Sequence, residues 1–86
     1  MNTEKTFADR LKELRNIRNY TQEELGKITN ISVQSIRRYE QGRLNEEPSA
    51  YNLLQLAKAL DVTPEYLLIG DNNMTSYTEA IKRELK

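Results

Sequence analysis

The stretch TQEELGKITNISVQSIRRYEQG, residues 21–42, decides the fold of this chain. Its first part predicts a short helix over residues 22–29. The Thr21 hydroxyl can cap this helix, and Glu24, three residues later, completes a capping box. Asn30 follows where a helix commonly ends in a left-handed residue, a conformation that Asn tolerates better than most side chains. Both ends of a short helix are therefore marked in the sequence.

The second part of the same stretch predicts another helix. Ser32 can cap a helix over Val33–Glu40, and Gly42 suits the residue that ends it. The two helices are then separated by a turn of only a few residues. That spacing is typical of a helix-turn-helix, in which the second helix lies in the major groove of duplex DNA.

The second helix turns a polar face away from the core. With about 100° of rotation per residue and Ile36 facing inward, Gln34 and Arg38 lie at roughly 160° and 200° and point outward. Glu40 turns back toward the domain. The candidate base-reading residues on the outward side, its flanks and its N-terminal tip are Val33, Gln34, Ser35, Arg37 and Arg38.

These side chains suit the edges of DNA bases. Arg can donate two hydrogen bonds to guanine, Gln can make a bidentate pair with adenine, and each such pair contributes roughly 1–3 kcal/mol of discrimination. Val33 or Ser35 could contact a thymine methyl group or a phosphate. The alternative is that two arginines and a glutamine only solvate a surface helix.

Helix N-termini are the expected sites of phosphate contact, because their free N–H groups and dipole favour anions. Gln22 and Ser32 are the best placed residues at the two helix starts. Arg43, in the following loop, is a further candidate. Glu46 and Glu47 lie in the same loop and would be repelled by phosphate. We therefore expect the far side of this loop to point elsewhere.

A helix before this stretch can begin at Thr6, with Asp9 in its first turn. We expect its apolar stripe to face the core, namely Phe7, Leu11, Leu14 and Ile17. We expect its outer basic residues to be solvated, namely Arg10, Lys12 and Arg18.

Further helices are predicted after the central stretch. Ser49 can cap a helix over Ala50–Leu60, and Pro64 opens a helix that Gly70 ends. Residues 71–74 then resemble a linker, followed by a short amphipathic helix over residues 76–86. That helix could dock on its own domain, pair with a second subunit or begin a longer protein.

Taken together, these residues resemble the helix-turn-helix of the Xre family, the Cro and phage-repressor type. Gly26 stands where the family usually has Ala, and the loop after Gly42 is slightly longer than is common. The likeness covers residues 5–70. The matching residues are Thr21–Leu25, Ile31, Ser32, Ile36, Glu40, Gly42, Pro48, Ser49, Leu53–Leu60 and Val62–Leu68.

The resemblance implies an all-α fold. We expect a five-helix lambda-repressor-like bundle over residues 1–70, followed by the linker and short helix of residues 71–86. In this family the residue matching Gln22 clamps the DNA backbone. Arg15 and Glu40 match a pair that forms a structural ion pair in phage repressors.

The resemblance also implies a function, because the family most often supplies transcriptional repressors. One recognition helix reads only a few base pairs, so we expect a homodimer on a palindromic duplex operator. Tyr66 and Ile69 are candidate dimer contacts, whereas we expect Leu67 to fill the core of its own domain.

Composition limits the other classes of function. The 86 residues include no His and no Cys, which removes the commonest general base and the thiolate metal ligands. We therefore expect no enzyme activity, no metal and no cofactor. No apolar run approaches the length of a membrane span and no signal-peptide pattern opens the chain, so we expect a cytoplasmic protein.

The net charge of zero is unevenly distributed. Residues 1–45 hold nine basic and six acidic residues, a balance of +3, and the remainder has a balance of −3. A basic half could face DNA, although ordinary mixed surface charge would look the same. An antitoxin or adaptor that binds a protein partner through its acidic C-terminal half is the alternative function.

Overall fold

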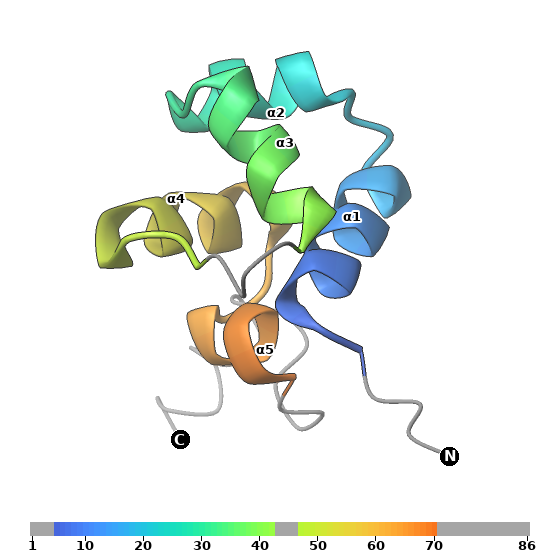
Figure 1. Cartoon of the computed structure of the whole chain (residues 1–86), viewed down its shortest axis with the longest axis vertical. Coiled ribbons are helices and arrows are strands. Elements are labelled where there is room, and N and C mark those ends of the chain that lie inside the picture. Colours follow the sequence, from blue (N-terminus) through green and yellow to red (C-terminus); the bar gives the residue numbers. More distant parts are fainter. Residues whose placement is uncertain (1–4, 43–46, 71–86) are drawn as a thin grey trace.

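The computed structural model describes residues 5–42 and 47–70. These residues form five helices and no strand (Figure 1), which confirms the predicted all-α fold. None of these helices is long and apolar enough to cross a membrane. Arg43 and the linker and helix predicted for residues 71–86 lie outside the described residues. The helices are α1 (Phe7–Ile17), α2 (Gln22–Thr29), α3 (Val33–Gln41), α4 (Ala50–Leu60) and α5 (Pro64–Ile69).

Each helix begins at a hydroxyl residue in extended conformation. The side-chain oxygen accepts the backbone N–H three residues later, which satisfies one of the free donors of the first turn. At Thr21 the predicted capping box is complete, since Glu24 accepts the backbone N–H of the cap in return. Thr6 forms a second capping box, in which Asp9 accepts the backbone N–H of Thr6. That backbone donor lowers the pKa of Asp9. The N-caps are Thr6, Thr21, Ser32, Ser49 and Thr63.

Left-handed residues end four of the helices, as predicted for Asn30, Gly42 and Gly70; the fourth is Asp61. Gly26 is required by the turn between α2 and α3. A Cβ atom there would lie 2.8 Å from the carbonyl oxygen of Ile31. Gly26 therefore lets the backbone of the turn close against α2.

Every helix contributes a fully buried side chain to one core. Leu67 is among them, so its predicted role in the core is confirmed. The rings of Phe7 and Tyr39 meet edge to face, with centroids 6.2 Å apart, and join α1 to α3. The largest fully buried side chains are Leu11, Leu25, Ile36, Leu56, Leu60 and Leu67.

Two predictions for α1 are wrong. Ile17 was placed in the core stripe, but its side chain is 66% exposed. It follows Leu11 by six residues, which turns it about 120° away from the core direction. Arg10 was expected to be solvated, but it is buried. Lys12 and Arg18 are exposed, as expected.

The Arg10 guanidinium is buried because it caps the end of α5. Its Nε donates to the Leu67 carbonyl at 2.9 Å and its Nη2 to the Leu68 carbonyl at 2.6 Å. A third hydrogen bond, from Nη1, reaches the Lys5 carbonyl at 2.6 Å. The last carbonyls of a helix lack N–H partners within it and carry its negative dipole end. Arg10 therefore fastens α5 to α1.

We expect Arg10→Met to lower the free energy of unfolding by about 2–3 kcal/mol, because buried carbonyls would lose a charged donor. Arg18→Met is the matched control, since Arg18 makes only an exposed ion pair with Asp61 at 3.4 Å. Its effect should stay within about 0.5 kcal/mol. Urea denaturation measures both changes; equal effects would contradict the role assigned to Arg10.

Candidate nucleic-acid interface

The helix-turn-helix lies at one end of the molecule. Figure 1 shows α2 and α3 together at the top of the view and α5 at the opposite end. Ile31 in the turn is buried, and α3 packs against both α1 and α2. The position of α3 is therefore set by two other helices.

The outward face of α3 is the one predicted. Ile36, Tyr39 and Glu40 are buried, which leaves the other side of the helix to solvent. The predicted base-reading residues differ in exposure: Gln34, Arg37 and Arg38 are exposed, while Val33 and Ser35 are half-buried. Their contacts with bases remain a prediction.

Hydrogen bonds to the hydroxyl groups of Ser32 and Ser35 connect the side chains on one flank of this face. The Ser32 hydroxyl accepts the backbone N–H of Ser35 at 3.1 Å and donates to the Ser35 hydroxyl at 3.0 Å. The Arg38 Nη2 donates to the same Ser35 hydroxyl at 3.4 Å. Since the Ser32 hydroxyl is used within the protein, Ser32 would meet a phosphate through the backbone N–H groups at the start of α3.

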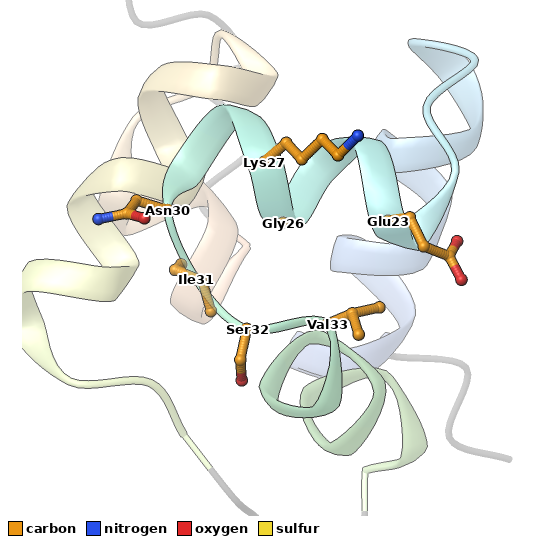
Figure 2. A pocket seen from close by; sticks show the side chains of 7 residues that line it. All are labelled: Glu23, Gly26, Lys27, Asn30, Ile31, Ser32 and Val33. Carbon is orange, nitrogen blue, oxygen red and sulfur yellow. The ribbon is translucent and has the colours of Figure 1, made fainter.

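A groove of about 530 Å³ runs between α2 and the turn that leads into α3 (Figure 2). Figure 2 shows Glu23 and Val33 on the same side of this groove, with Lys27 above it and Ser32 below. Asn30 and Ile31 line its other end. One cation and one carboxylate at its edge give it no net charge, so it offers little attraction to an anion.

Glu40 joins three helices beneath the outward face. Its carboxylate accepts from the Nε of Arg15 at 2.6 Å and from its Nη2 at 3.1 Å. The contact confirms the predicted ion pair, and the carboxylate raises the pKa of Arg15. Arg15 also donates to the Tyr20 carbonyl at 2.8 Å. The Nε2 of Gln22 donates to Glu40 at 3.1 Å. The side-chain amide of Gln22, the predicted phosphate ligand, is therefore already hydrogen-bonded within the protein.

A second hollow, of about 500 Å³, opens between α1, α2 and α3. It brings Gln22 and Arg37 together, although the sequence had assigned one to phosphate and the other to bases. Sequence reasoning missed two of its residues, Lys12 and Gln41. Helical spacing could have found them, because Lys12 lies three residues before Arg15 and Gln41 four after Arg37. The lining is Lys12, Gln22, Arg37, Glu40 and Gln41.

Arg37 is held at the edge of this hollow by an acid from α2. Its Nη2 lies 3.2 Å from Oε2 of Glu23, and both side chains are largely exposed.

Far from this pair, on α5, the candidate dimer contacts differ in burial. Tyr66 packs half-buried against the core, whereas Ile69 is 70% exposed. No group of metal-binding residues occurs in the part of the chain that the structure describes.

Comparison with known proteins agrees with this geometry. A family model described as helix-turn-helix matches residues 11–67. The repressor protein C2 of Salmonella phage P22 is 38% identical over 76 residues, which are 88% of this chain and 34% of that protein. The HTH-type transcriptional regulator DicA of Escherichia coli is 34% identical over 68 residues, 79% of this chain and 49% of that protein.

A solved structure of the P22 c2 repressor in complex with a synthetic operator superimposes on this chain. Its TM-score is 0.73 at 35% identity, and the match covers 79% of this chain and all of that one. The chain spans between a third and a half of the length of the two curated relatives.

We expect Glu40→Ala to lower the free energy of unfolding by about 3 kcal/mol, because it leaves the largely buried Arg15 charge without its partner. Glu23→Ala, which breaks an exposed ion pair, should cost less than about 1 kcal/mol. Thermal unfolding of both variants checks this. An unchanged melting temperature for Glu40→Ala, together with an altered base preference, would show that Glu40 reads DNA instead.

Proposed function

The chain belongs to the helix-turn-helix family, and we propose that it binds duplex DNA sequence-specifically as a transcriptional repressor. The observation that carries this proposal is the outward face of α3, where Gln34, Arg37 and Arg38 are exposed while Glu40 anchors the opposite side. The names of the two relatives, a repressor and a transcriptional regulator, support it. We place this activity in the cytoplasm.

In the proposed complex α3 lies in the major groove. Gln34 and Arg38 point most directly away from the core and would pair with base edges. Val33 and Ser35 lie beside them and would contact a thymine methyl group or a phosphate. Ser35 already accepts a hydrogen bond from Arg38, which limits the orientations open to that guanidinium before DNA arrives.

Backbone contacts would come from the start of α2. The side-chain amide of Gln22 has two N–H donors, one of which is used by Glu40 at 3.1 Å. Its second donor is available for a phosphate oxygen. Because Glu40 fixes the amide in place, less side-chain entropy would be lost when the phosphate binds.

Specificity for one operator requires two reading helices. We propose a homodimer on a palindromic site, with half-sites about one helical turn apart. The apolar end of α5 would form the contact, since Ile69 is exposed there and Tyr66 lies half-buried beside it. Arg10, by fastening α5 to α1, would hold that contact surface in place.

Selection of duplexes from a random pool by the pure protein provides the first test of the proposal. On the selected site, we expect Arg38→Ala to lose about 1–3 kcal/mol of preference at one base pair. Gln22→Ala should weaken binding to all sequences alike. Affinities at a stated salt concentration measure both effects. If both variants bind as the parent does, this face is not the DNA-binding surface.

We expect Ile69→Lys to shift the protein from dimer to monomer, because it places a charge in the proposed apolar contact. Ile28→Lys is the matched control, since Ile28 is an exposed isoleucine on α2. Sedimentation equilibrium measures the mass of each variant. If Ile69→Lys stays dimeric, the dimer is formed by another surface.

A purification test separates this proposal from the antitoxin or adaptor alternative. Stoichiometric co-purification of a second protein, with no duplex selected by the pure protein, would favour the alternative. Tight binding of a palindromic duplex by the pure protein favours the repressor.

A further inference from the structure

The hollow between α1, α2 and α3 has the composition of an anion site. Lys12 and Arg37 contribute cations, and Gln22 and Gln41 contribute side-chain amides. The hollow opens where Gln22 begins α2, so the free N–H groups and positive dipole end of that helix lie beside it. Three separate helices thus bring donors to one place.

The carboxylate of Glu40 inside this hollow does not cancel these cations. Its side chain is only 3% exposed, and the guanidinium of Arg15 neutralises it through two hydrogen bonds. The Gln22 amide donates to it as well. Glu40 therefore lines the base of the hollow, and its negative charge is already balanced by Arg15.

Glu23 is the acid that affects the hollow, through Arg37. It does not line the hollow but lies exposed on α2, with its Oε2 3.2 Å from Nη2 of Arg37, which does line it. Exposed ion pairs of this kind are weak and are readily exchanged. Arg37 is therefore held near the hollow while remaining available to a stronger partner.

The direction of Arg37 on α3 separates it from the base-reading residues. It lies about 100° from the inward-facing Ile36, whereas Gln34 and Arg38 lie about 160° and 200° from it. Arg37 thus turns toward α2, as its contact with Glu23 shows. From there it would meet the DNA backbone beside the groove.

The phosphate contact of Gln22 is already part of the proposed function; we propose that Lys12 and Arg37 bind the same backbone phosphate from α1 and α3 across this hollow, and that Glu23 weakens the site by competing for Arg37. This inference rests on the proposed function and changes the role of Arg37 from base reading to phosphate binding. Arg37 exchanges a carboxylate for a phosphodiester, whose geometry a guanidinium matches in bidentate fashion. The displaced Glu23 then repels the same phosphate.

The test is a double-mutant cycle on the selected duplex, with affinity measured over a range of salt concentrations. We expect Glu23→Gln to tighten binding about two- to fivefold, and to steepen the slope of log affinity against log salt. We expect Arg37→Ala to weaken binding and to reduce that slope by about 0.9, the value for one phosphate contact. The double variant should match Arg37→Ala, because Glu23 acts only through Arg37.

Glu13→Gln is the matched control. Glu13 also forms an exposed ion pair, at 2.8 Å with Lys5, but on another side of α1. It changes the net charge by the same amount, so it measures the general electrostatic effect. Base preferences should be the same in the parent, Glu23→Gln and Arg37→Ala.

Three results would overturn the inference while leaving the proposed function intact. The first is that Glu23→Gln binds no more tightly than Glu13→Gln. The second is that Glu23→Gln still tightens binding when Arg37 is already Ala. The third is that Arg37→Ala changes the preference at one base pair without changing the salt slope, which would make Arg37 a base reader. If the parent binds no duplex, the proposed function fails and the inference fails with it.

Discussion

The structure depends on the buried carboxylate of Glu40. A charge in this position is costly unless it is paired and hydrogen-bonded, and it is satisfied by Arg15 from α1 and Gln22 from α2. Because Glu40 belongs to α3, these bonds fix the rotation of that helix about its axis. The rotation in turn decides which side chains face solvent. The same interaction that stabilises the bundle therefore selects the side chains on the exposed face of α3, which we propose as the DNA-reading face.

Helix α1 connects the two ends of the molecule. Its Arg15 holds α3 at the helix-turn-helix, while its Arg10 holds the last carbonyls of α5. The two arginines are five residues apart, so they project from α1 about 140° apart. A dimer can set the distance between two reading helices only if each subunit is stiff between its contact surface and α3. In this chain two guanidinium groups on one helix supply that connection.

Local features were predictable from the residues themselves, whereas the one tertiary ion pair that was predicted, between Arg15 and Glu40, followed from the family resemblance. Each N-cap depends on residues three positions apart, so Thr21 with Glu24 and the Ser32 cap could be read directly, and the structure confirms both. The burial of Glu40 followed from helical rotation. The burial of Arg10 was not predicted because two of its three partners are carbonyls more than fifty residues away, and a backbone carbonyl gives no residue-specific signal in a sequence. The pairing of Arg37 with Glu23 was missed for the same reason: it depends on how α2 and α3 pack.

The pairing of basic residues explains how a chain with zero net charge can suit a DNA-binding role. Arg10 donates hydrogen bonds to backbone carbonyls, and acidic side chains form ion pairs with Lys5, Arg15, Arg18 and Arg37. Non-specific affinity for DNA grows with the number of phosphates that a protein neutralises. Among the described residues, Arg10, Arg15 and Arg18 are engaged within the protein, which would lower the affinity for arbitrary sequences. Under the proposed function, recognition of the operator would then depend on Gln34 and Arg38, the exposed side chains that point most directly away from the core, while the phosphate contacts of Gln22 and Arg37 position α3.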